Sequence, residues 1–200
     1  MYEKKRFLIV FIILLIVSIL VYINYDYISF LTFKRSHILN NNKYEFSNSL
    51  NNTVFRFQIY PSQIEHNKNE ILINKNISSY FDTNLILNKI IKKDTSILLL
   101  ITLKTRWQYT LGNCLTTGEF HKDANNENKI VESGPNQIST KVVDETGNLL
   151  ESSATGFGFL NGNEYFVLEL NTPDTDFFRK ESIVVEFTGL NHLMYKIISN

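Results

Sequence analysis

The chain has 200 residues, and its 20 lysine and arginine residues balance its 20 aspartate and glutamate residues. This balance argues against a nucleic-acid-binding protein, which normally carries a net basic face to neutralise phosphates. The only cysteine, Cys114, has no partner for an internal disulfide. We expect a small buried side chain there, and a reactive or intermolecular thiol is the alternative.

An apolar run close to the N-terminus predicts a membrane anchor. Residues 7–23 are apolar apart from Ser18 and Tyr22, and about 17 residues is the lower limit for a helix that crosses a hydrocarbon core ~30 Å thick. The helix is expected to continue to Phe33, because aromatic residues suit the membrane interface. The side chains expected to anchor the helix in lipid are Phe7, Ile9, Phe11, Leu14, Leu15 and Leu20.

Three other interpretations of this run are weaker. A cleaved signal peptide needs small residues at the cleavage site, and no alanine or glycine follows the run before Gly112. A lipoprotein needs a cysteine near the end of the run, where there is none. A buried core helix would rarely begin at residue 7 behind three positive charges. The sequence therefore favours an uncleaved signal-anchor with a single span.

The charges that flank the run predict the orientation of the anchor. Lys4, Lys5 and Arg6 precede it, whereas Lys34 and Arg35 lie about ten residues beyond its other end. Basic residues favour the cytoplasmic side. We therefore expect the N-terminus in the cytoplasm and the C-terminal domain outside it.

The chain divides into four segments by this interpretation. Residues 1–6 form a short tail, residues 7–33 the transmembrane helix with its interfacial extension, and residues 34–43 a polar linker rich in asparagine. Residues 44–200 form the globular domain.

Alternation of apolar and polar residues predicts strands in the globular domain. Residues 54–60 place Phe55, Phe57 and Ile59 on one face, which is typical of a half-buried strand. The continuous apolar run of residues 97–101 predicts a central strand that is covered on both faces. Residues 79–92 fit either a helix or a strand, because short apolar runs do not distinguish the two.

Turn signals separate the later strands. Asn161-Gly162 between hydrophobic runs is a strong hairpin signal, and Gly147 suits a second tight turn. Residues 113–137 are polar and are expected to form a long loop. Strands that recur every ~8–12 residues predict an antiparallel β-sandwich, immunoglobulin-like in the loose sense, although the Cys-Trp-Cys pattern of antibody domains is absent.

One cluster of side chains has the chemistry of a metal site. Glu119, His121 and Asp123 alternate along the chain, so an extended backbone would point all three to the same side. Two carboxylates and an imidazole are ligands for zinc or another divalent ion, and Cys114 is near enough to join them. The alternative is a solvated polar loop.

A second candidate site follows Pro173. Phe177, Phe178 and Arg179 offer two aromatic rings and a guanidinium to a partner, and packing of both rings on the core is the alternative. Trp107 is likewise expected either to stack on a ligand or to pack in the core.

Motifs for a serine nucleophile elbow, a nucleotide-binding loop or an H-E-x-x-H zinc site do not occur in the sequence. We therefore expect no cofactor, and a membrane-anchored, non-enzymatic binding or interaction module outside the cytoplasm. The partners expected are membrane lipid through the helix and an envelope protein or glycan, but no nucleic acid. The alternatives are a membrane-anchored metal-dependent hydrolase that uses the Glu119/His121/Asp123 cluster, and a small subunit of a membrane complex.

Overall fold

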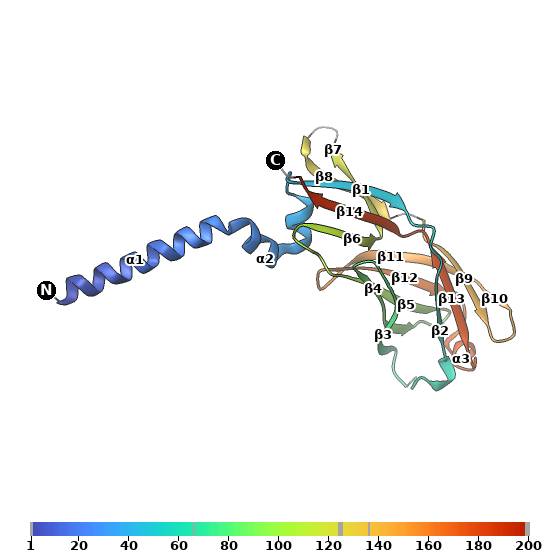
Figure 1. Ribbon diagram of the computed structural model, residues 1–200. Helices are drawn as coiled ribbons and strands as arrows, with labels where there is room; N and C mark the ends of the chain where they lie inside the picture. The colour runs from blue at the N-terminus through green and yellow to red at the C-terminus, as the bar shows by residue number, and fades with distance from the viewer. Residues whose placement is uncertain (1, 66, 124–125, 136, 199–200) are drawn as a thin grey trace.

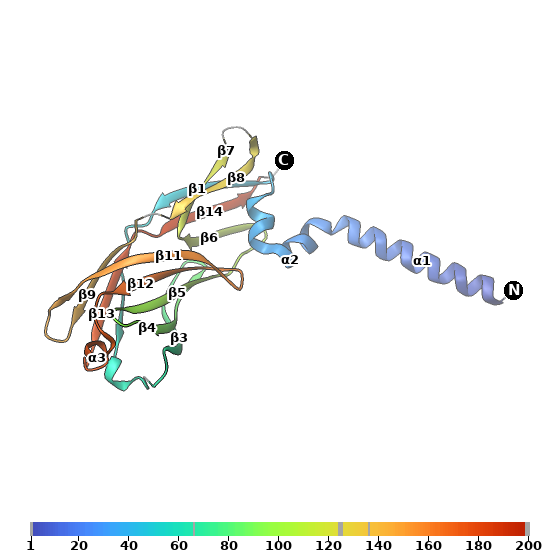
Figure 2. The ribbon, with the colours of Figure 1, turned by 180° about the vertical axis from the view of Figure 1, so that it is seen from behind.

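The computed structural model describes residues 2–65, 67–123, 126–135 and 137–198, with the backbone alone for residues 2–9, 122–123, 126–131 and 135. It is mainly β, with several antiparallel sheets that follow two N-terminal helices, α1 (Tyr2–Ile23) and α2 (Tyr25–Leu39). Figure 1 and the reverse view in Figure 2 show α1 projecting away from the sheets, while α2 lies against them.

The two helices are separated by a sharp bend at Asn24. Within the described residues, no single helix is long and apolar enough to cross a membrane. The segments Val10–Ile23 and Tyr25–Leu39, bent by 56°, pass that test together by length and composition, as a signal sequence would. Along α1, four of the predicted anchor residues are about half exposed: Phe11, Leu14, Leu15 and Leu20. Phe7 and Ile9 lie in the same helix, but their side chains are outside the described part.

The strands form four antiparallel sheets. The five-stranded sheet has the order β11 (Ser152–Leu160), β12 (Asn163–Leu170), β5 (Ile97–Thr105), β4 (Thr83–Lys92), β3 (Glu70–Tyr80). The four-stranded sheet has the order β10 (Leu149–Leu150), β9 (Ser139–Asp144), β13 (Ile183–Thr188), β2 (Phe55–Ile59). The three-stranded sheet has the order β1 (Tyr44–Leu50), β14 (Asn191–Ile197), β6 (Leu111–Thr116), and β7 (Gly118–Asp123) pairs with β8 (Asn126–Pro135). Two short helices, a 3-10 turn (Pro61–Gln63) and α3 (Asp174–Phe177), lie in the connections.

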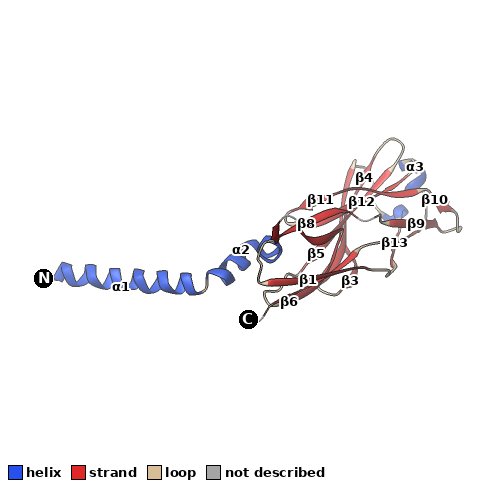
Figure 3. Cartoon of the chain, turned by 90° about the horizontal axis from the view of Figure 1, so that it is seen from above, coloured by secondary structure: helices blue, strands red, loops and turns tan. Residues whose placement is uncertain are grey.

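The larger hydrophobic core lies between the five-stranded and four-stranded sheets, which are seen from above in Figure 3. Strand β5 is central, and Leu99, Leu100 and Ile101 are all buried, so both of its faces are covered as its continuous apolar run predicts. From the opposite sheet, β2 contributes alternate side chains, Phe55, Phe57 and Ile59. This confirms the period of two in its sequence.

A smaller core lies under the three-stranded sheet and holds α2 against it. Its buried members come from both helix and sheet: Phe30, Ile38, Leu39, Tyr44, Cys114, Phe120, Leu193 and Tyr195. Cys114 is 1% exposed and is a free thiol, as the sequence leads one to expect.

The three-stranded and four-stranded sheets are joined by a bend that β1–β2 and β13–β14 share. Gly189 takes a φ of +101° at this bend, and a Cβ atom there would lie 2.7 Å from the Gln137 carbonyl oxygen. The Asn51 amide donates to the Leu190 carbonyl at 2.9 Å, which continues the pairing across the corner. Glycine is therefore required at position 189.

Both predicted hairpins are present. The β11–β12 turn is Asn161-Gly162, with φ values of +51° and +77°, the combination that a type I′ turn needs. The β9–β10 turn contains Gly147 at φ +85°, and the Asp144 amide donates to the Asn148 carbonyl at 3.0 Å.

The structure differs from two sequence expectations and decides one alternative that the sequence left open. Residues 113–137 were expected to form a loop, but most of them lie in β6, β7 and β8. The ambiguous segment 79–92 forms the end of β3 and all of β4. The stretch expected to be a linker from residue 34 begins instead inside α2, which ends at Leu39, and Ile38 and Leu39 are buried in the smaller core.

Candidate functional site

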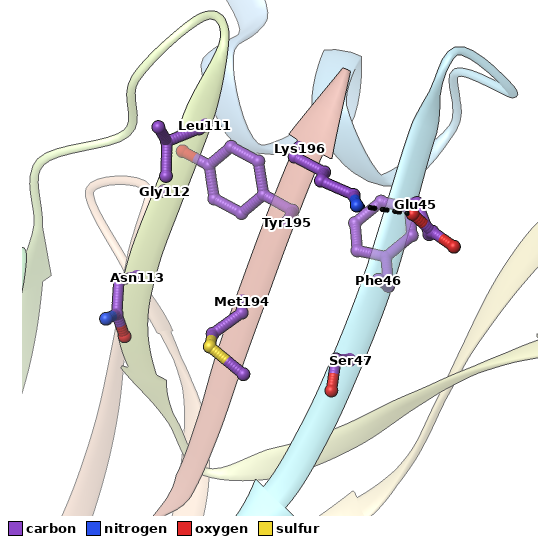
Figure 4. Close-up of a pocket in the computed structure, with 9 residues that line it drawn as sticks. All are labelled: Glu45, Phe46, Ser47, Leu111, Gly112, Asn113, Met194, Tyr195 and Lys196. Atoms are coloured by element: carbon purple, nitrogen blue, oxygen red, sulfur yellow. Dashed lines mark ion pairs between the residues drawn. The ribbon is translucent and has the colours of Figure 1, made fainter. Parts of the chain in front are cut away.

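The outer face of the three-stranded sheet carries an open groove of about 440 Å³. Its lining residues come from three adjacent strands, as Figure 4 shows: Glu45, Phe46 and Ser47 from β1, Leu111, Gly112 and Asn113 from β6, and Met194, Tyr195 and Lys196 from β14. These segments are far apart in the sequence and are brought together only by strand pairing. We call the solvent-facing side of this sheet, with its groove, the outer face.

Strand register arranges the outer face in rows. In one row Lys196 lies between Glu45 and Leu111, and in the next Met194 lies between Ser47 and Asn113. Leu111 is 60% exposed on the edge strand β6 and Met194 is 41% exposed on the central strand β14, so the groove has two uncovered apolar side chains. The Lys196 ammonium pairs with the Glu45 carboxylate at 3.1 Å at the end of the sheet that adjoins α2. Each row of the outer face therefore exposes one large apolar side chain, and the row nearest α2 also holds a charged pair.

An aromatic pair extends the outer face toward the β3–β4 turn. The rings of Phe81 and His192 are nearly parallel, with 4.2 Å between their centroids, and Phe81 remains 49% exposed. The His192 ring is also hydrogen-bonded to the Asn113 side chain. Burial lowers the pKa of His192, which favours its neutral form at neutral pH.

The groove has a rigid floor. The Tyr195 hydroxyl accepts a hydrogen bond from the Gln108 amide at 2.8 Å and donates to the Gln108 carbonyl at 3.0 Å. The Tyr44 hydroxyl donates to the Tyr109 carbonyl at 2.7 Å, and burial raises its pKa to about 12. Gly112 makes room for the Tyr195 ring, because a Cβ atom there would lie 2.2 Å from that ring. These contacts fix the sheet from behind, so the groove is preformed.

An ion-pair joint fixes α2 to the sheets. Arg35 in α2 pairs with Glu132 at 3.0 Å and with Glu164 at 3.3 Å, and its guanidinium lies 4.4 Å from the ring centroid of Phe159. The Glu164 carboxylate also accepts hydrogen bonds from the Thr117 amide at 2.7 Å and the Thr117 hydroxyl at 3.0 Å. Burial raises the pKa of Glu164, while the nearby Arg35 charge opposes that rise. Because both acceptors come from the sheets, Arg35 fixes the orientation of the part of α2 that follows a kink at Phe33.

The predicted metal cluster is described only in part. Glu119 and His121 lie on β7 and are exposed, whereas the side chain of Asp123 is outside the described part, so that set remains a prediction. Within the described side chains, no group of three or more His, Cys, Asp or Glu residues is placed to hold a metal ion. Cys114 packs with Phe120 in the smaller core. Glu119 and His121 flank Phe120 in β7, so they point to the other side and Cys114 does not join them.

The second predicted site is largely inside the protein. Phe177 is fully buried and Phe178 is 6% exposed, and both rings belong to the larger core at α3. Arg179 is exposed beside them. The two phenylalanine rings therefore take the core-packing alternative, which leaves Arg179 alone at the surface. Trp107 also packs, with its ring 5.8 Å from that of Tyr195.

The outer face was not anticipated from the sequence. Its residues are ordinary strand residues in β1, β6 and β14, and β6 lies in a segment expected to be mostly loop. The chain matches no protein-family model, and comparison with curated proteins and with solved structures finds no match either. Any functional argument therefore rests on the geometry of the chain itself.

Proposed function

We propose that the chain is a membrane-anchored, non-enzymatic interaction module whose domain lies outside the cytoplasm and binds a partner on the outer face. The observation that carries this proposal is the groove with its exposed Leu111 and Met194. We further propose that the sheets form a β-sandwich, immunoglobulin-like in the loose sense, which presents the outer face as a rigid surface.

The chemistry of the outer face favours a protein partner in the cell envelope over a glycan. Interfaces between proteins commonly have an apolar centre with a polar rim, and the Glu45–Lys196 pair and Ser47 supply such a rim. Methionine adapts its shape to an opposing surface. A preformed groove also lowers the entropy lost on binding.

Site-specific photo-crosslinking in intact cells tests this proposal. A photoreactive amino acid replaces Ser47 at the edge of the groove in the full-length chain. We expect a discrete adduct of higher mass, and we expect Met194→Lys to remove it because a charge is then forced into the apolar centre. Leu149→Lys is the matched control, because Leu149 is 71% exposed and lies on β10, away from the groove.

Two outcomes would count against the proposal. The first is the absence of any specific adduct from Ser47. The second is an adduct that survives Met194→Lys as well as it survives the Leu149→Lys control.

A further inference from the structure

One face of helix α2 contacts the rest of the domain, and the opposite face does not. On the contacting face, the Asp26 carboxylate pairs with Lys43. The Tyr27 ring meets Tyr109 edge-on at 5.3 Å, and Phe30 is 5% exposed. Phe30 is thus packed into the domain, whereas Tyr27 contacts the domain at its edge and stays 48% exposed.

The opposite face of α2 is apolar and uncovered. Tyr25 is 65% exposed, Ile28 is 39% exposed and Leu31 is 52% exposed. Their spacing of three residues places them along one side of a helix. This side is turned away from Phe30. We call these three residues the free face of α2.

We infer that the free face of α2 lies in the interfacial region of the bilayer that α1 crosses. The occupant is therefore lipid at the level of the headgroups and the upper acyl chains. This inference rests on the proposed membrane anchor. Of the bent pair, α1 then enters the hydrocarbon core, and α2 lies at the boundary with its other face fixed to the domain.

Helix α2 follows α1 almost directly, so it begins where the apolar run ends. Only Asn24 separates the two helices, so Tyr25 lies directly after the end of α1. As a helix, the apolar residues 7–23 are about 25 Å long. This is the lower limit for a span.

The charged residues of α2 limit how deep this helix can lie in the bilayer. Asp26, Lys34 and Arg35 lie within α2, and charged side chains are costly in the hydrocarbon core. Tyrosine, by contrast, is enriched at the membrane interface, where its ring is apolar and its hydroxyl is solvated. Helix α2 is thus too polar to enter the bilayer and too apolar on its free face to be left in water.

Contacts with the sheets hold both parts of α2 in place. Arg35 and Ile38 lie beyond Phe33, where a kink divides α2, so they fix the second part of the helix to the sheets. The first part, which carries the free face, is held by Phe30, which is 5% exposed and packs in the smaller core. Contact between the free face and lipid therefore fixes the orientation of the whole domain relative to the membrane. The end of the three-stranded sheet that adjoins α2 is then the end nearest the membrane (Figure 1).

Depth measurements on the full-length chain in phosphatidylcholine vesicles test this inference. Single cysteines are introduced as Ile28→Cys and Leu31→Cys and carry a nitroxide label, which the buried Cys114 thiol does not compete for. Collision with oxygen, which partitions into lipid, is compared with collision with a water-soluble nickel chelate. Leu14→Cys in α1 reports the hydrocarbon core, and Leu149→Cys on β10 reports water.

We expect positions 28 and 31 to fall between these two references, with collisions with nickel severalfold rarer than at position 149. Water-like values at 28 and 31 with a lipid-like value at 14 would overturn the inference and leave the anchor intact. Water-like values at position 14 as well would overturn the anchor itself. Values at 28 and 31 as deep as those at 14 would place α2 in the hydrocarbon core and would also overturn the inference.

Discussion

Asp144 closes the β9–β10 turn as a hydrogen-bond acceptor. Its carboxylate pairs with Lys180 at 2.8 Å and accepts from the Thr146 hydroxyl at 2.7 Å and from the Asn148 amide at 2.9 Å. The hydrogen bonds from Lys180 and then Thr146 hold the pKa of this carboxyl well below its usual range. Ionised Asp144 therefore stabilises the folded state.

This predicts a pH-dependent effect of Asp144→Asn. A folded-state pKa below the unfolded value of about 4 gives a stabilisation that is complete above that pH and is lost as the pH falls through the folded-state pKa. We expect Asp144→Asn to melt below the parent at pH 7, and the gap to narrow as the pH falls below about 4. Thermal melts of the full-length chain in non-ionic detergent measure this. Asp176→Asn on α3 is the control, and a gap that does not change with pH would contradict the assignment.

Single residues also show where prediction from sequence succeeded. Asn161 and Gly162 specify their turn locally, so the hairpin was predictable. The burial of Cys114 was expected from its residue type. The partners of Arg35 were not predictable, because Glu132 and Glu164 are 97 and 129 residues away in the chain. Nothing local in the sequence signals that pairing.

At the scale of elements, strand β6 depends on a glycine that packs under a tyrosine ring. Gly112 lies opposite Tyr195 in the three-stranded sheet. Gly112→Ala would push the ring off the two hydrogen bonds that it makes with Gln108. We expect a loss of about 1–3 kcal/mol in the free energy of unfolding. Denaturant titration in detergent measures this.

Gly134→Ala is the matched control for that prediction. Gly134 lies in β8, and a Cβ atom there would have no neighbour within 4 Å. We expect its effect to stay within about 0.5 kcal/mol. Equal losses for the two variants would show that Gly112 has no special packing role.

Elements buried on one or both faces were recognisable from the sequence, and elements stabilised by distant pairing were not. The burial of strands β2 and β5 can be read from the pattern of apolar residues in their own sequences. Strands β7 and β8 pair with each other through polar segments, so composition indicated a loop. The groove was even harder to predict. The rows of residues that line it depend on the register of β1 with β14 and on that of β14 with β6. These registers are properties of the folded chain.

At the scale of the whole molecule, the proposed membrane anchor predicts on which side of the membrane the domain lies. Lys4, Lys5 and Arg6 favour a cytoplasmic N-terminus. We expect proteinase K added to intact cells or spheroplasts to remove a C-terminal tag and cleave the exposed segment around Lys68. An N-terminal tag on the same chain should stay protected. Protection of the C-terminal tag until the membrane is lysed would place the domain in the cytoplasm.

The pairing of β1 with β14 has a consequence for the timing of folding. The first strand meets the last, and Leu50 and Asn191 are partners although about 140 residues separate them. At ~5–20 residues per second, synthesis of the intervening chain takes roughly 7–28 s. Throughout that interval β1, which follows α2, has no partner strand and its edge stays open. A chain interrupted before β14 would keep that edge open and would be prone to pair with a neighbouring chain.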